Sequence, residues 1–158
     1  MFRELTRIKQ KLSQEESISI LKQQPRGVLS LMGDDGYPYG VPIDHWYNEA
    51  DGKIYFHSGK TGYKVDAIGR CSKASVCVCD EGYRLEGDWA LHIKSVIVFG
   101  RIRIVEDHEK ALELTRSLSR KYTSDEAYIQ KEIDSFGHEV LVFALEPEQI
   151  TGKVTKES

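Results

Sequence analysis

Short apolar runs separated by turn sequences constrain the fold of this chain most. Residues 27–32 form one run, which ends at Asp34-Asp35-Gly36, a sequence typical of a hairpin turn. A second run follows over residues 39–47, and residues 48–52 form another turn sequence. Because strands joined by tight turns run antiparallel, the pattern predicts an antiparallel sheet.

Four more strands and several helices complete the expected fold. A Ser13-Glu16 capping box starts a helix that Pro25 ends, and Asp107 starts another. Further helices are expected from about residue 61 and over 124–135, and a polar tail from Pro147 onward. The remaining strands are expected over 53–57, 74–80, 94–105 and 139–145. Residues 1–158 therefore predict a single domain of the mainly β (α+β) class, a six-stranded antiparallel barrel with peripheral helices and a core of about 25–153.

Four positions in the strands carry extra information. Pro42 predicts an edge or bulged strand, because proline has no N–H to donate to a neighbouring strand. Gly100 predicts a bulge or a close approach of another backbone. Cys77 and Cys79 alternate with valines on one face of a strand, and we expect them to be buried or half-buried free thiols.

Composition and motifs exclude several classes of function. The net charge of -3, with no long basic block, argues against nucleic-acid binding, and no apolar run is long enough to span a membrane. The N-terminus is charged and lacks a signal-peptide pattern, so we expect a cytoplasmic protein. Three cysteines and scattered histidines predict neither disulfides nor a metal site. P-loop, GxGxxG, HExxH and GxSxG motifs are absent from the sequence.

One segment, SGKTGYK at residues 58–64, carries several features of an anion site. It follows a predicted strand, contains two glycines that let the backbone approach a ligand, and leads into a predicted helix. Lys64 lies in the first turn of that helix, where the helix dipole disfavours a cation by about 0.3–1 kcal/mol unless an anion is present. The segment therefore predicts phosphate binding; the alternative is a glycine-rich connection with an exposed lysine.

Longer motifs resemble a known family. They are DGYPYGVPIDHWY, GKIYFHSGKTGYKVDAI, SVIVFGRIRIVED and the closing ITGK, in that order. Together they are similar to the nitroimidazole-resistance (Nim) branch of the pyridoxamine 5'-phosphate oxidase-like flavoproteins, from about residue 25 to 153. The resemblance implies a split β-barrel that forms a homodimer, with flavin mononucleotide (FMN) bound between the subunits.

The resemblance also implies which residues hold the cofactor. One strand would line the flavin ring with its backbone, the end of another would contact the flavin and its ribityl chain, and Lys64 and Ser95 would contact the phosphate. Tyr63 stands where the oxidases carry an arginine, so one phosphate charge must come from elsewhere. The oxidases' C-terminal tryptophan and arginine, which hold pyridoxal phosphate, have no counterpart after Gly137. The complete set of expected cofactor-binding residues is Val41, Pro42, Ile43, Phe56, His57, Ser58, Lys64 and Ser95.

The expected function is reduction of a small planar acceptor, such as a nitro-aromatic, by FMN that NAD(P)H reduces. His57 is the candidate catalytic residue as a proton donor, or else a residue that only hydrogen-bonds FMN or the backbone. Trp46 and Trp89 are candidates for an apolar lid, or for core or dimer packing. Two alternatives stay open: a non-catalytic FMN or haem carrier or sensor, and an all-β interaction module without a cofactor.

Overall fold

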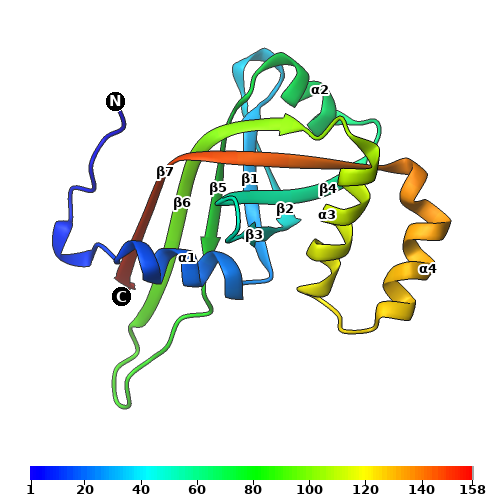
Figure 1. Cartoon of the computed structure of the whole chain (residues 1–158). Helices are drawn as coiled ribbons and strands as arrows, with labels where there is room; N and C mark the ends of the chain where they lie inside the picture. The colour runs from blue at the N-terminus through cyan, green and yellow to red at the C-terminus, as the bar shows by residue number, and fades with distance from the viewer. Residues whose placement is uncertain (158) are drawn as a thin grey trace.

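The computed structural model describes residues 1–157 and contains one seven-stranded antiparallel sheet with four α-helices (Figure 1). The strands follow the order β2-β1-β5-β6-β7-β4-β3 across the sheet. They are β1 (Arg26–Met32), β2 (Pro38–Asp44), β3 (Trp46–Asn48), β4 (Lys53–Gly59), β5 (Lys73–Cys79), β6 (Leu91–Ile104) and β7 (Val140–Glu157). The helices are α1 (Gln14–Gln23), α2 (Tyr63–Arg70), α3 (His108–Arg120) and α4 (Glu126–Phe136), with 3-10 turns η1 (Ile8–Gln10), η2 (Asp34–Gly36) and η3 (Gly137–Glu139).

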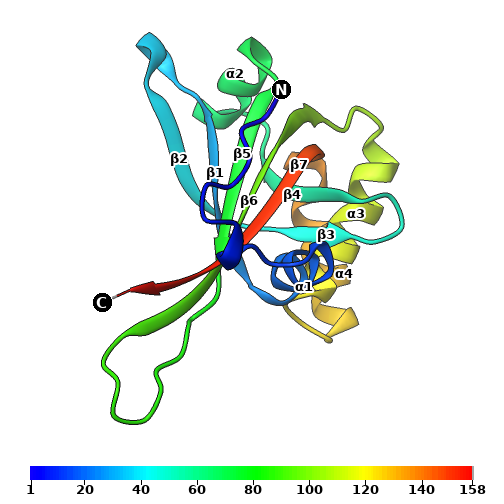
Figure 2. The ribbon, with the colours of Figure 1, turned by 90° about the vertical axis from the view of Figure 1, so that its left-hand side faces the viewer.

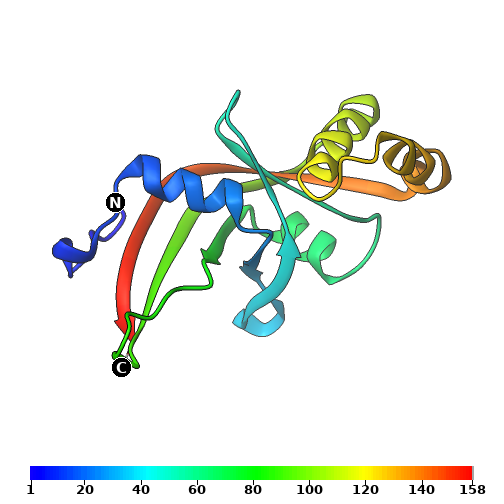
Figure 3. The ribbon, with the colours of Figure 1, turned by 90° about the horizontal axis from the view of Figure 1, so that it is seen from below.

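The sheet curls around its inner face, which carries the main core. Side chains alternate between the core and the outside, as in β1, where Leu29 and Leu31 are buried and Val28 is exposed. Figure 3 shows α1 lying across one end of the curled sheet, and Figure 1 shows α2 at the other end. Leu21 of α1 and Ala67 of α2 complete the same core. The predicted mainly β split barrel with peripheral helices is therefore confirmed.

The sheet has seven strands rather than the expected six, because the run over residues 39–47 is broken at His45. The residues before it form β2, which pairs with β1, and those after it form β3, which pairs with β4. Since β2 and β3 are the two outermost strands of the sheet, a single residue joins one edge of the sheet to the other. His45 therefore connects the two edges of the curled sheet through the chain, but β2 and β4 do not pair, so the barrel remains split between them.

The predicted helix starts are confirmed. Ser13 and Glu16 form the reciprocal capping box of α1, with the Glu16 amide donating to the Ser13 hydroxyl over 3.1 Å. The Asp107 carboxylate caps α3, and Asp125 caps α4. No helix within residues 1–157 is both long enough and apolar enough to cross a bilayer.

The expected polar tail after Pro147 is wrong, because β7 continues to Glu157 and pairs with β6 along its whole length. Pro147 is tolerated within this strand because it lies at a bulge, where the register shifts between Phe99 and Gly100. The bulge predicted at Gly100 is thus confirmed, and so is the close approach: a Cβ there would lie 2.2 Å from the Glu146 carbonyl oxygen.

The thiols of Cys77 and Cys79 do lie on one face of β5, but they are exposed rather than buried. The reason is that both thiols point to the outer face of the sheet, away from the core. Figure 2 shows the N-terminal segment crossing in front of β5, and Phe2 of this segment stacks on Phe99 of β6, with ring centroids 5.7 Å apart. We call the exposed apolar part of this surface the outer sheet face. Its members are Val28 and Met32 of β1, Cys77 of β5, and Ile97 and Phe99 of β6.

Candidate functional site

The segment between β4 and α2 is the predicted phosphate site, and it has the expected local structure. Gly62 is the N-cap residue of α2, with φ of +125°, a conformation that favours glycine. No side chain caps the helix. The first amide groups of α2 therefore lack an intrahelical partner, and the Cβ positions of Gly59 and Gly62 face open space. A phosphate fits this junction.

Lys64 lies in the first turn of α2, as predicted, and its side chain is half-buried. Within the part of the chain that the structure describes, no carboxylate forms an ion pair with it. The helix dipole and the lysine thus place two sources of positive potential at one point. Asp66 is the acidic residue of the same first turn, and within residues 1–157 it forms no ion pair with Lys64.

Tyr63 precedes Lys64 and serves the fold instead of the junction. Its hydroxyl accepts a hydrogen bond from the Asp34 amide over 2.6 Å, and its ring lies 4.4 Å from the ring of Tyr39. Arg70 of α2 also pairs with the Asp34 carboxylate at 2.8 Å. Tyr63 therefore anchors α2 to the β1–β2 turn and adds no charge to the junction.

His57 lies near the end of β4, close to two charged residues. Burial of its ring lowers its pKa, although the residue is exposed at the edge of the sheet. The Asp44 carboxylate opposes this shift, and Lys64 adds to it. These electrostatic contacts bring together the end of β2, the end of β4 and the start of α2, with His57 neutral at pH 7.

The other predicted residues of β2 and β4 point in different directions. Val41 and Ile43 pack toward the core, and Pro42 faces outward on an edge strand, as predicted. Phe56 is fully buried in the core, so only its backbone is near the site. Ser58 is half-buried two residues before the α2 loop.

Ser95 is not brought to this junction within one chain. It lies in β6 opposite Lys153 of β7, on the outer side of the sheet, while its neighbour Val96 is buried in the core. The helix α2 packs against the inner side through Ala67 and Ile68. Ser95 and Lys64 therefore belong to opposite sides of the sheet.

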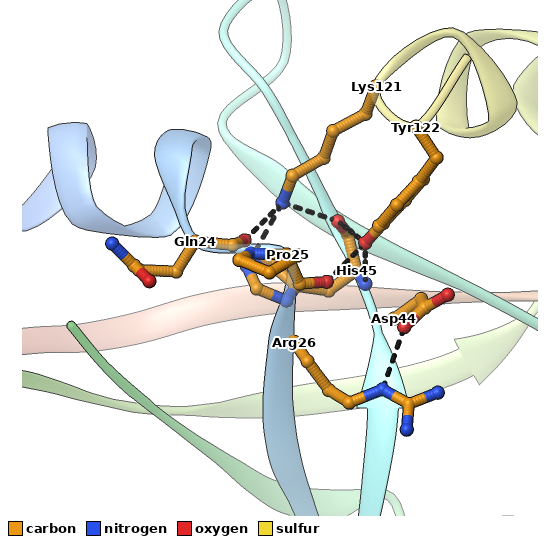
Figure 4. A network of polar contacts seen from close by, with 7 residues as sticks. All are labelled: Gln24, Pro25, Arg26, Asp44, His45, Lys121 and Tyr122. Atoms are coloured by element: carbon orange, nitrogen blue, oxygen red, sulfur yellow. Dashed lines mark hydrogen bonds and ion pairs between the residues drawn. The ribbon is translucent and has the colours of Figure 1, made fainter. Parts of the chain in front are cut away.

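A polar network at the His45 corner was missed by the sequence analysis (Figure 4). The corner residue leaves the sheet ladders, so its backbone groups need other partners. The Lys121 ammonium donates to the carbonyl oxygens of His45 and Gln24, both over 2.7 Å. The Tyr122 hydroxyl accepts from the His45 amide over 3.0 Å and donates to the Pro25 carbonyl.

Burial sets the protonation of this network. Burial, and then the charge of Lys121, lower the pKa of His45 to about 4, and burial lowers the pKa of Lys121 to about 8. The His45 Nε2 lies 2.8 Å from the Leu21 carbonyl oxygen and must donate to it, so Nδ1 carries the lone pair. Nδ1 is buried and has no partner within residues 1–157. No local sequence pattern predicts this network, because Lys121 lies 76 residues after His45.

The two tryptophans have different surroundings. Trp46 packs against Tyr55, with ring centroids 5.6 Å apart, which agrees with a packing role. Trp89 is 73% exposed in the loop before β6, away from the β4–α2 junction. Residues 1–157 contain no group of three or more His, Cys, Asp or Glu placed to hold a metal ion.

The chain folds as a split β-barrel, and sequence comparison identifies the family. The sequence profile of the family described as pyridoxamine 5'-phosphate oxidase matches residues 13–154. The chain belongs to this family. Comparison with curated protein sequences gives no match.

Solved structures with the same fold come from several bacteria. A candidate 5-nitroimidazole antibiotic resistance protein from Bacteroides thetaiotaomicron is 22% identical, with a TM-score of 0.80 over 93% of this chain and 87% of that one. The flavocytochrome Anf3 from Azotobacter vinelandii is 19% identical, with a TM-score of 0.77 over 96% and 72% of the two chains. A FAD-binding protein from Mesorhizobium loti is 25% identical, with a TM-score of 0.64 over 92% and 96%.

Proposed function

We propose that this protein is an FMN-dependent oxidoreductase that reduces small planar acceptors, including nitro-aromatics of the nitroimidazole type. The observation that carries the proposal is the β4–α2 junction. There the uncapped helix start lies beside Lys64, which forms no ion pair within residues 1–157, and Gly59 and Gly62 face open space. A phosphate monoester would satisfy the free amides and neutralise the lysine. Membership of the pyridoxamine 5'-phosphate oxidase family, and the similarity to a FAD-binding protein, support the proposal that this phosphate belongs to a flavin.

The residues around the junction have separate tasks in this proposal. The free edge of β2 at Pro42 and the backbone at Phe56 border the ring system, and Ser58 and Lys64 hold the ribityl phosphate. When bound, FMN supplies the transfer of two electrons from NAD(P)H to the acceptor. His57, neutral at pH 7, hydrogen-bonds to the bound molecules and moves a proton at its ring nitrogen.

We further propose that the protein acts as a homodimer that covers the outer sheet face. Monomeric proteins rarely expose large apolar patches, and Val28, Met32 and Phe99 are each 40% exposed or more. A second copy on this face explains that exposure. It also gives Ser95 a role, because Ser95 lies on the same side of the sheet and would reach the phosphate bound by the partner.

A non-catalytic carrier is the second candidate. The similarity to the flavocytochrome and to a FAD and haem binding protein from Mycobacterium smegmatis favours it, since these names describe cofactor binding. The two candidates differ in one property: a carrier holds the cofactor without passing electrons from NAD(P)H to a small acceptor.

Titration of purified protein with FMN and with riboflavin tests the proposal. We expect FMN to bind at least about tenfold more tightly than riboflavin, because only FMN carries the phosphate. The FMN-loaded protein should lose its visible absorbance with anaerobic NADPH and regain it when a nitroimidazole is added. Equal affinity for both flavins would overturn the phosphate site, and a flavin that NADPH never bleaches would favour the carrier.

A further inference from the structure

A cavity of about 320 Å³ lies between the sheet and the helical hairpin formed by α3 and α4. We call it the hairpin cavity. Its sheet wall contains His57 of β4 and Val140 of β7, and its other wall comes from α3, α4 and Gly137. We infer that the hairpin cavity binds the electron acceptor, and that it accepts a small neutral or cationic heteroaromatic ring. This inference rests on the proposed function.

The charges on the walls determine which ligands fit. None of the residues within 1–157 that line the cavity is a lysine or an arginine, and one of them, Glu132 of α4, is acidic. An anion would lose its water without gaining a cation, which is unfavourable in a partly buried site. The cavity therefore disfavours phosphorylated or carboxylate substrates and accepts neutral or cationic ones.

The apolar part of the wall fits a flat ring. Ile129 is 2% exposed, and Ile133, Phe136 and Val140 line the cavity beside it. The volume is near the lower end of the range for small-molecule sites, which is about 300–1,000 Å³. A single ring with short substituents matches this size, whereas the three-ring system of a flavin belongs in the more open space at the β4–α2 junction.

Polar groups on both walls can orient such a ring. His57 stands on the sheet wall, where its neutral ring offers one donor and one acceptor nitrogen, and the Glu132 carboxylate on the helix wall accepts hydrogen bonds. The Thr115 hydroxyl donates to the Ala111 carbonyl over 2.8 Å, so toward the cavity it offers only an acceptor. Glu132 and Thr115 therefore offer acceptors to a ring that carries an N–H donor, as imidazoles do, and the hydroxyls of Ser119 and Tyr128 can donate to its substituents.

His57 connects the hairpin cavity to the flavin site. It lines the cavity, and it lies two residues before Gly59, where β4 ends and the loop to α2 begins. The charge of Lys64 also helps to lower its pKa. A ring bound in the cavity against His57 therefore lies next to the molecule held at the β4–α2 junction. This arrangement places the acceptor and the proton donor side by side.

Calorimetric titration of the FMN-loaded protein with 2-methyl-5-nitroimidazole tests this inference. We expect Ile133→Trp, which fills the cavity, to weaken probe binding by about tenfold or more while FMN affinity stays unchanged. Glu132→Gln should weaken it by about fivefold, because a charged acceptor becomes neutral. The matched control is Glu113→Gln, an exposed position on α3 outside the cavity, which should have no effect. The anionic ring 4-nitrobenzoate should bind wild-type protein at least about tenfold more weakly than the probe.

Two results would overturn the inference: unchanged probe binding in both cavity variants, or 4-nitrobenzoate binding as tightly as the nitroimidazole. Melting curves of Ile133→Trp show whether it folds, and Glu132→Gln decides the question if it does not. Wild-type protein that binds the probe but no FMN would overturn the proposed function, and with it the assignment of the cavity to an electron acceptor.

Discussion

Two lysines at helix ends, Lys64 and Lys121, have opposite surroundings. Lys121 is the C-cap residue of α3, where the helix dipole favours a cation, and its ammonium donates to backbone carbonyls of other segments. Lys64 is in the first turn of α2, where the dipole disfavours a cation, and it has no ion pair within residues 1–157. Lys121 therefore stabilises the fold, whereas Lys64 can bind a ligand.

The largest expected effect comes from replacing Lys121. Lys121→Met removes the donor to the carbonyls of half-buried Gln24 and buried His45, at about 1–3 kcal/mol for each unsatisfied group. We expect the free energy of unfolding to fall by about 4 kcal/mol in urea denaturation. Lys131→Met, at an exposed position of α4, should change it by less than about 0.5 kcal/mol. A similar small loss in both variants would show that the network does not stabilise the corner.

The pH dependence of stability tests the same corner. His45 has a pKa of about 4 in the folded protein, against about 6.5 unfolded, so between these values the unfolded state binds more protons. Stability is therefore retained above pH 6.5 and lost as pH falls toward 4, by about 3 kcal/mol for this group. Denaturation at pH 7 and pH 4.5 should show a smaller loss for His45→Gln than for wild type. Parallel curves for the two proteins would contradict the assignment.

Replacing Lys64 should affect ligand binding instead of stability. We expect Lys64→Ala to weaken FMN binding by about tenfold and to leave riboflavin binding unchanged, because the ammonium contacts only the phosphate. The unfolding free energy of the flavin-free protein should change by less than about 0.5 kcal/mol. Fluorescence titration and urea denaturation measure the two effects. FMN occupancy equal to that of wild type would remove Lys64 from the site.

The smallest effect is expected at Tyr63, which anchors α2 to the fold and lies next to Lys64 in the sequence. Tyr63→Phe removes the acceptor of the Asp34 amide but keeps the ring contact with Tyr39. We expect a loss of about 1 kcal/mol in unfolding free energy, since the Asp34 turn is exposed and water can replace the hydroxyl. FMN affinity should stay unchanged in titrations. A loss of FMN affinity without a loss of stability would mean that Tyr63 contacts the ligand.

Local patterns predicted most of the fold. The Ser13 cap, the turn at Asp34–Gly36 and the edge position of Pro42 all follow from short-range chemistry, and the structure confirms each. The errors have tertiary causes. Pro147 is accommodated in a strand only because Gly100 on the neighbouring strand provides a bulge, and Cys77 is exposed because its side of β5 is the outer face of the sheet.

The candidate site was predictable only in part, for the same reason. The start of α2 with Lys64 is a continuous segment, so its local sequence describes it. The hairpin cavity joins His57 to residues of α3 and α4 more than 50 positions later, and no periodicity connects them. The neutral state of His57 also depends on burial by these distant segments.

The single residue between β2 and β3 has a mechanical consequence for the flavoprotein that we propose. Because His45 ties the two edge strands together covalently and is fully buried, the separation of β2 and β4 is fixed at that point. Any widening of the split barrel must therefore occur away from this residue.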